Sequence, residues 1–224
     1  MTYSFCTLFD RNYLFKGLCL YRSLVKQCPD FWLWILCMDE VTYELLQKMD
    51  LKNTTLMRLS EVESPDVLVA KKNRGVGEYC WTLSSVLTHF VLTKNPEIEM
   101  LSYLDSDLYF YMDPKPIYDE MMRKSIGIIR HNHAPKLRYM EKRAGIYNVA
   151  MVLFRNDPNG LECLAVWREQ CLNWCYNRLE DGKFGDQMYL DEWPTRYQGV
   201  QVIQHKGADV APWNVTGYSV TESK

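Results

Sequence analysis

The chain has 224 residues, of which 47% are hydrophobic and 24% charged, as in water-soluble globular proteins and unlike disordered chains. Its 26 Lys and Arg against 28 Asp and Glu give a net charge of −2, which excludes the strongly basic surface of a nucleic-acid-binding protein. No run of about 18 apolar residues could cross a bilayer, so we expect one folded domain over residues 1–224 without a transmembrane segment.

The first half of the chain alternates predicted strands with predicted helices. Phe31–Met38 is apolar throughout, which is typical of a strand covered on both faces. Such alternation indicates βαβ units and therefore an α/β fold with a mixed, mainly parallel sheet flanked by helices. The predicted strands are Tyr3–Phe9, Phe31–Met38, Thr54–Leu59 and Glu99–Phe110, and the predicted helices are Leu14–Val25, Thr42–Met49 and Glu78–Thr93.

The second half contains fewer predicted elements. Strands are expected at Ser125–Arg130, Tyr147–Phe154 and Gly199–Gln204, with a long helix over Leu161–Arg178. The segment Gly217–Val220 has the pattern of a further strand, which leaves open whether the domain is complete or truncated at its C-terminus.

The segment Glu99–Phe110 is the most informative, because this predicted strand carries two carboxylates at its C-terminal end. Asp105 and Asp107 stand at i and i+2, positions that point to the same side of a strand. Two carboxylates so placed form a compact oxygen site for a hard divalent cation, Mg²⁺ or Mn²⁺. Ligands of α/β sheets bind beyond the carboxyl ends of the strands. A cation there would neutralise the diphosphate of a nucleotide-diphosphate sugar.

Four other polar groups each have two interpretations. Asp10, Asn12 and Tyr13 could line a nucleoside pocket, or cap the helix that starts at Leu14. Asn148, on an apolar strand, needs hydrogen-bond partners, from backbone groups or from a bound hydroxyl.

Asp186 and Gln187 could grip sugar hydroxyls and stabilise a developing oxocarbenium ion, or simply begin a helix. His205 could be a third metal ligand or a structural residue.

Five motifs occur in a fixed order: Asp-x-Asn-Tyr, Tyr-Leu-Asp-Ser-Asp, Tyr-Asn-Val-Ala, Asp-Gln, and a His that precedes Pro-Trp. In this order the sequence resembles nucleotide-sugar glycosyltransferases of the GT-A fold, of the family-eight type and related uncharacterised bacterial transferases. The resemblance covers nearly the whole chain. It implies one Rossmann-like GT-A domain over residues 1–224.

The resemblance also implies roles for single residues. Asp105, Asp107 and His205 would bind Mn²⁺ or Mg²⁺, and Asp186 and Gln187 would act in catalysis at the donor sugar. The residues implied to bind the nucleotide-sugar are Asp10, Asn12, Tyr13, Asp105, Asn148, Lys206 and Trp213.

Three positions depart from the family pattern. Gly207 follows His205 by two residues instead of three, and Ala211 replaces the Lys before Pro-Trp, so a diphosphate contact is lost or moves to Lys206. Met188 replaces the second Asp of an Asp-Gln-Asp triplet. Related bacterial sequences continue into another His-rich strand. If that strand supplies the metal ligand, His205 is structural and this chain is incomplete.

The resulting hypothesis is a metal-dependent glycosyltransferase that moves a sugar from a nucleotide-diphosphate sugar to a glycan, lipid-linked or other acceptor, as in polysaccharide biosynthesis. The resemblance favours a UDP-sugar and retention at the anomeric carbon. One alternative is a degenerate or truncated domain that binds the nucleotide-sugar without turnover, which the departures favour. The other is a phosphatase with an aspartate nucleophile, although that class carries its Asp-x-Asp on the first strand.

The eight cysteines include no Cys-x-x-Cys pair, and the N-terminus lacks the charged and apolar regions of a signal peptide. We therefore expect a reduced, cytoplasmic protein. The same features are compatible with peripheral attachment at the inner face of the membrane.

Overall fold

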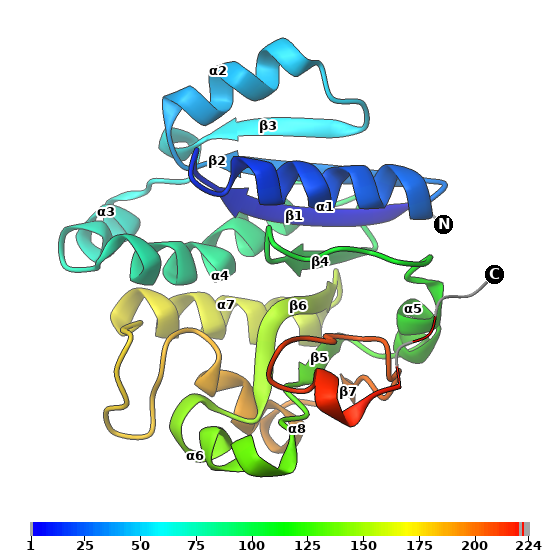
Figure 1. Ribbon diagram of the computed structural model, residues 1–224. Coiled ribbons are helices and arrows are strands. Elements are labelled where there is room, and N and C mark those ends of the chain that lie inside the picture. Colours follow the sequence, from blue (N-terminus) through cyan, green and yellow to red (C-terminus); the bar gives the residue numbers. More distant parts are fainter. Residues whose placement is uncertain (1, 220, 222–224) are drawn as a thin grey trace.

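The computed structural model describes residues 2–219 and 221, and its centre is one seven-stranded sheet in the order β3-β2-β1-β4-β6-β5-β7 (Figure 1). Only β6 runs against its neighbours β4 and β5, while the other pairs are parallel. This arrangement confirms the predicted mixed, mainly parallel α/β fold. The strands are β1 Tyr3–Phe9, β2 Phe31–Cys37, β3 Thr54–Arg58, β4 Met100–Leu104, β5 Ile126–Arg130, β6 Tyr147–Arg155 and β7 Val200–Val202.

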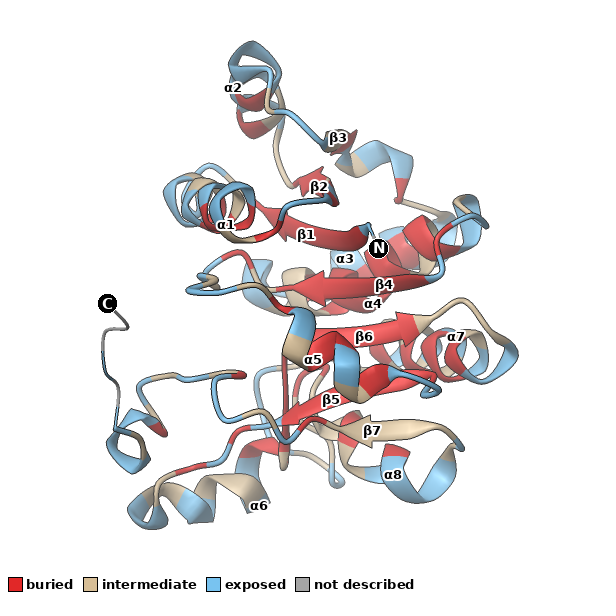
Figure 2. Ribbon diagram, turned by 90° about the vertical axis from the view of Figure 1, so that its right-hand side faces the viewer, coloured by how far each residue is buried: buried red, intermediate tan, exposed pale blue. Residues whose placement is uncertain are grey.

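Helices cover both faces of the sheet, and Figure 2 shows the buried strands between them. One core lies between the sheet and α3, α4 and α7, and the other between the sheet and α1, α2 and α5. The four central strands, β1, β4, β5 and β6, are buried on both faces, as the continuous apolar runs indicate. The helices are α1 Leu14–Gln27, α2 Glu40–Met49, α3 Pro65–Lys72, α4 Val76–Lys94, α5 Lys115–Met121, α6 Glu141–Ala144, α7 Pro158–Asn173 and α8 Trp193–Arg196, with 3₁₀ turns η1 Leu59–Glu61, η2 Pro135–Met140, η3 Met188–Glu192 and η4 Val215–Gly217.

The strand directions bring six chain segments to one edge of the sheet. Because β4 and β5 both run against β6, they are parallel to each other. The C-terminal ends of β1, β2, β3, β4, β5 and β7 therefore share an edge with the N-terminal end of β6. We call this the carboxyl edge, and the opposite one the amino edge.

Several predicted boundaries were wrong. The strand predicted to reach Phe110 ends at Leu104, because the backbone turns so that the Leu108 N–H donates to the Asp105 carbonyl at 3.2 Å. Asp105 and Asp107 consequently lie in a turn and not on a strand. The long helix α7 ends at Asn173, since the next residue, Trp174, is extended.

The helices α3, α5, α6 and α8 were not predicted. Helix α3 carries only a weak apolar pattern after its first residue, Pro65, and the other three are between four and seven residues long, too short for a helical period to stand out. The segment predicted as a further strand contains η4 up to Gly217, and Val220 lies outside the described residues. All eight cysteines are free. Within residues 2–219 and 221, no helix has both the length and the apolar character needed to cross a membrane.

Candidate functional site

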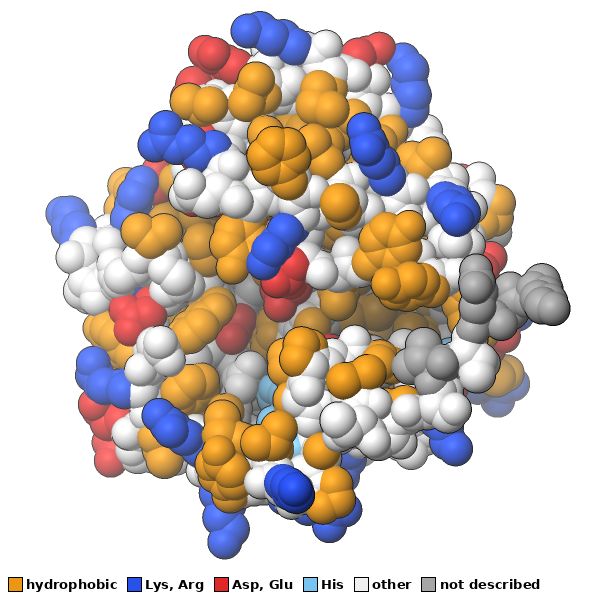
Figure 3. Space-filling model, in the orientation of Figure 1, with side chains coloured by type: hydrophobic (Ala, Val, Ile, Leu, Met, Phe, Trp, Pro, Cys, Tyr) orange, Lys and Arg blue, Asp and Glu red, His pale blue; other side chains and the backbone are white. Residues whose placement is uncertain are grey.

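A hollow crosses the face of the molecule between helix α1 and the segment 205–217, and acidic and histidine side chains lie along it (Figure 3). Its walls come from the carboxyl edge of the sheet. The polar groups there belong to segments that are far apart in the sequence and meet only in the fold.

The loop after β1 is held by its own side chains. The Asp10 carboxylate accepts the backbone N–H of Asn12 at 2.9 Å and of Tyr13 at 3.1 Å, and also the Asn12 amide at 2.7 Å. This turn positions the Tyr13 ring, which is 45% exposed, under the ammonium of Lys16 at 4.2 Å from the ring centroid. The aromatic face of Tyr13 therefore lies beside the hollow.

The turn after β4 brings the two predicted metal-binding carboxylates to the same edge. Asp105 is partly buried and its Oδ1 accepts a hydrogen bond from the Tyr103 hydroxyl at 3.0 Å. Burial, and then the charge of Asp107, raise the pKa of Asp105 to about 6, against the lowering effect of the Tyr103 hydrogen bond. Asp107 is half exposed and pairs with Lys16 at 3.3 Å. Lys16 thus links Tyr13 to Asp107.

Asp186 is a buried carboxyl group, and the 3₁₀ turn η3 that follows it has Gln187, not Asp186, at its N-cap. Its Oδ2 accepts the hydroxyl of Ser84 on α4 at 2.8 Å, and its carbonyl accepts the Trp167 indole N–H at 2.9 Å. Burial raises the pKa of Asp186 to about 7, with a further contribution from the charge of Asp105. The neighbouring Gln187 donates its amide N–H to the Ala144 carbonyl.

Asn148 has a side-chain partner that the sequence did not suggest. Its amide donates to Oδ2 of Asp209 at 2.9 Å. Burial raises the pKa of Asp209 to about 7, the Asn148 hydrogen bond lowers it, and the charge of Asp105 raises it further. Asp209 has a left-handed backbone with φ of 56°, a conformation that Asp tolerates better than most residues. The charge of Asp105 thus raises the pKa of both Asp186 and Asp209.

The loop that carries Asp209 is fixed by the buried amide of Asn214. This amide donates to the carbonyls of Asp209 and His131, both at 2.8 Å. The His131 ring stacks on His133 with centroids 4.8 Å apart and meets the ring of Trp213 edge-on at 5.9 Å. In the part of the chain that the structure describes, His133 Nδ1 and Trp213 Nε1 are buried without a hydrogen-bond partner.

His205 lies on the same edge, after β7, and its hydrogen bonds are with Glu120 and Gly207, not with Asp105 or Asp107. Its backbone N–H donates to Glu120 of α5 at 2.8 Å, and its ring Nδ1 accepts the Gly207 N–H at 3.2 Å. Lys206 is exposed. Among the described residues, no three His, Cys, Asp or Glu side chains are arranged to hold a metal ion, so Asp105, Asp107 and His205 are not assembled as a three-ligand set.

Two curated relatives match nearly the whole chain. The uncharacterized protein YfnD of Bacillus subtilis (strain 168) is 34% identical over 221 residues, covering 98% of this chain and 71% of YfnD. The uncharacterized protein YfnF of the same organism is 34% identical over 220 residues, covering 96% of this chain and 73% of YfnF. This chain belongs to the YfnD and YfnF family. No protein-family model matches the sequence.

Solved structures show which fold this family has. Mouse xyloside xylosyltransferase 1 superposes with a TM-score of 0.56 at 18% identity, covering 91% of this chain and 85% of that one. The glycosyltransferase GlyE of Streptococcus pneumoniae TIGR4 gives 0.57 at 14% identity, with 91% and 45% covered. The galactosyltransferase LgtC in complex with donor and acceptor sugar analogs gives 0.53 at 14%, with 90% and 73% covered. The fold is the GT-A glycosyltransferase fold, as the resemblance implied.

The donor atoms at the carboxyl edge fit a divalent cation in part. The carboxylates of Asp105 and Asp107 are the hard oxygen ligands that Mg²⁺ and Mn²⁺ prefer. A cation at Asp107 must displace the ammonium of Lys16, which now pairs with that carboxylate.

Sequence reasoning missed several groups of this YfnD-family site. Lys16 and Ser84 lie in helices, where their polar side chains look like ordinary surface or back-bonded residues. Asp209 lies between His205 and the Pro-Trp pair, yet nothing in the local sequence indicates a hydrogen-bond partner 61 residues away. The His131-Asn-His133 sequence directly after a strand was the one local signal that could have been used.

Proposed function

We propose that this chain is a metal-dependent glycosyltransferase that transfers a sugar, with retention, from a UDP-sugar to a carbohydrate-type acceptor, and that residues 1–224 form one transferase domain. The observation that carries the proposal is the contact chain Tyr13–Lys16–Asp107 beside Asp105. It joins an aromatic face suited to a nucleobase to two carboxylates suited to a diphosphate-bound cation, in a fold whose solved examples include glycosyltransferases.

Each group has a chemical task in this proposal. When bound at Asp105 and Asp107, Mn²⁺ or Mg²⁺ supplies positive charge to the leaving diphosphate. Tyr13 stacks on the base, while Asp10 and Asn12 accept and donate hydrogen bonds to the nucleoside. Whether His205 completes the metal site remains a prediction for the metal-bound state.

The buried groups act on the sugar. The ionised form of Asp186 stabilises the positive charge that develops at the anomeric carbon, because a preorganised charge is most effective where water is excluded. Gln187 uses its nitrogen for the Ala144 carbonyl and keeps its amide oxygen for a sugar hydroxyl. Asn148, held by Asp209, lies next to Asp105 and contacts the donor. Lys206 and Trp213 contact the diphosphate from the segment 205–217.

The test is a thermal-shift screen of UDP, GDP and CMP with their common sugars, with and without Mn²⁺. A ligand at 100 times its Kd stabilises by about 2.7 kcal/mol. We expect a Mn²⁺-dependent rise with UDP-sugars that Asp107→Ala abolishes. The matched control is Asp119→Ala, because Asp119 is an equally exposed carboxylate paired with a lysine, Lys115, away from the hollow. This control should respond like the wild type.

A wild-type Mn²⁺ response in Asp107→Ala would overturn the assignment of the metal-binding residues. Transfer is then separated from simple binding by slow hydrolysis of the donor. A transferase releases some sugar to water over hours, whereas a binding domain leaves the donor intact.

A further inference from the structure

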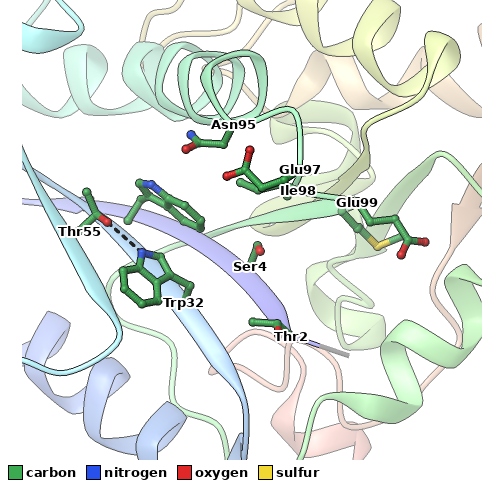
Figure 4. A pocket seen from close by; sticks show the side chains of 10 residues that line it. Thr2, Ser4, Trp32, Thr55, Asn95, Glu97, Ile98 and Glu99 are labelled. Carbon is green, nitrogen blue, oxygen red and sulfur yellow. Dashed lines mark hydrogen bonds between the residues drawn. The ribbon is translucent and has the colours of Figure 1, made fainter.

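A second cavity of about 690 Å³ opens at the amino edge of the sheet, at the opposite end of the strands from Asp105. This volume is within the range of about 300–1,000 Å³ that is usual for small-molecule sites. Figure 4 shows that its side chains come from three adjacent strands, β1, β2 and β3, and from the loop between α4 and β4.

The cavity exists because the helical layer stops short of the strands. On this face the core is made by α3, α4 and α7. Helix α4 ends at Lys94, and residues 95–99 turn back to β4 along the rim instead of covering the first residues of β1 and β2. The N-terminal ends of these strands therefore present side chains that no helix covers within the described residues.

Two indole rings line this cavity. Trp32 and Trp34 stand at i and i+2 of β2 and so share a face of the sheet, with ring centroids 6.4 Å apart and planes inclined by 56°. Trp34 is partly buried against the core, while Trp32 is 40% exposed. The Trp32 indole N–H donates to the hydroxyl of Thr55 at 2.8 Å, as drawn in Figure 4. The exposed ring is thus held in one orientation before any ligand arrives, which lowers the entropy cost of binding.

The polar groups around the rings indicate the charge of the ligand. Ser4 and Thr55 offer hydroxyls and Asn95 an amide, while the lining residues, as far as the structure describes them, include no lysine or arginine. Two carboxylates also line the cavity, Glu97 and Glu99, and Glu99 pairs with Arg155 from outside the lining. The Glu97 carboxylate, which no lysine or arginine of the lining neutralises, repels phosphates, nucleotides and anionic lipids. Flat rings beside hydroxyl, amide and carboxylate groups instead match a ligand with apolar C–H faces and many hydroxyls.

We propose that this cavity binds a neutral oligosaccharide, which stacks on Trp32 and donates hydroxyl hydrogen bonds to Glu97 and Asn95. The binding of a saccharide here does not depend on the proposed function. Only the further step, that this saccharide is part of the acceptor glycan, rests on it. A second attachment point raises the effective concentration of the acceptor at the carboxyl edge.

The experiment observes the indole N–H signals of the ¹⁵N-labelled full chain by NMR, with the Trp32 signal assigned from Trp32→Phe. The probes are maltohexaose, cellohexaose, chitohexaose and mannohexaose, with hexagalacturonate as the anionic control. We expect a saturable shift of the Trp32 signal with at least one neutral probe and none with hexagalacturonate. Followed on the indole signal of Trp34, which lines the same cavity, Trp32→Ala should weaken binding at least ten-fold, and Trp32→Phe, which keeps a ring, less than that.

The melting temperature of Trp32→Ala must match that of the wild type. We expect this result because the Trp32 ring is exposed. The proposal is overturned if no neutral probe shifts the signal at about 10 mM, where a millimolar Kd would be detected. It is also overturned if Trp32→Ala binds as well as the wild type, or converts a dimer into a monomer, since a second copy would then cover the cavity.

The same samples keep this proposal separate from the proposed function. Trp32→Ala should retain the Mn²⁺-dependent response to UDP-sugars, and Asp107→Ala should retain the Trp32 shift. If UDP-sugars give no Mn²⁺-dependent thermal shift, the NMR result with the oligosaccharides can therefore still be interpreted. If the oligosaccharides do not bind, the thermal-shift result with UDP-sugars likewise still stands.

Discussion

The two edges of the central sheet carry different kinds of side chain. At the carboxyl edge, Asp105, Asp186 and Asp209 are each hydrogen-bonded to a neighbouring side chain, and burial raises all three pKa values. At the amino edge, Trp32 and Trp34 lie beside hydroxyl groups. Properties of the first edge should therefore depend on pH and cations, whereas those of the second should depend on ring surface and on the hydrogen bonds of the lining side chains.

The buried carboxyl groups make the carboxyl edge the less stable of the two edges at neutral pH. A buried carboxylate lowers the stability of the folded state at neutral pH, because the unfolded chain hydrates it better. Groups that destabilise in this way are expected at sites that use their charge. Exposed indole rings make no such demand, so the amino edge can bind a ligand at little expense to folding.

Asp186→Asn should give the largest change. The unfolded chain ionises Asp near 3.8, while the folded chain does so near 7, so the folded state holds the proton more strongly and wild-type stability falls between these pH values. We expect the variant, whose amide oxygen still accepts from Ser84, to be more stable than the wild type by about 4 kcal/mol at pH 8.5, and only as stable as the wild type at pH 3.5. Transfer activity should fall.

Urea titrations at the two pH values measure this effect, and Asp119→Asn is the exposed control, expected to remain near the wild type. A stability gain for Asp186→Asn that does not change with pH would contradict the buried, protonated carboxyl group. The difference between the edges would then not be one of ionisation.

Asn148→Ala should have an intermediate effect. It removes the amide that Asp209 accepts, leaving that partly buried carboxyl group without its described donor. Loss of one partner of a buried hydrogen bond costs about 1–3 kcal/mol. Asn173→Ala is the matched control, because Asn173 is an exposed asparagine at the end of α7.

Denaturant unfolding at pH 8 compares the two asparagine variants. Equal stabilities would mean that the Asn148–Asp209 contact contributes nothing, and that the loop is held by Asn214 alone. Donor affinity, measured on the same samples, should fall for Asn148→Ala only.

Lys16→Ala should have the smallest effect, and it should strengthen a binding equilibrium where Asn148→Ala weakens one. The lysine competes with a cation for Asp107, and exposed ion pairs are weak, so its removal should tighten Mn²⁺ binding by no more than about five-fold. Titration of Mn²⁺ followed by electron paramagnetic resonance measures this directly. Lys115→Ala, which frees an equivalent carboxylate away from the site, should leave Mn²⁺ affinity unchanged; weaker binding in Lys16→Ala would mean that Lys16 assists the site instead of competing.

The fold was predictable because its signals are local. The strand Tyr3–Phe9 was predicted to the residue, since an apolar run ends at Asp10. Alternation of strands and helices then fixed the α/β class, and parallel strands fixed the edge at which ligands bind. Helices without a strong apolar stripe, such as Pro65–Lys72, could not be predicted from the periodicity of apolar residues.

Only some members of the candidate site could be proposed from the sequence. Asp10 and Asp105 drew notice because each directly follows an apolar strand, and Asn148 because it lies at the start of one. Their partners come from elsewhere: Ser84 is 102 residues from Asp186 and 61 residues separate Asn148 from Asp209. These pairs are set by helix packing and by the path of the segment 205–217, which leave no trace in local spacing.

Helix α4 belongs to both edges. Its N-terminal half supplies Ser84 to Asp186, and its C-terminal end leads into the rim of the tryptophan cavity. From Ser84 to the C-terminal Lys94 the helix rises about 15 Å at 1.5 Å per residue. If a growing glycan is held at both places, the helix acts as a ruler: short acceptors can occupy only one of them, and the protein would distinguish acceptors by length before it distinguishes them by sugar.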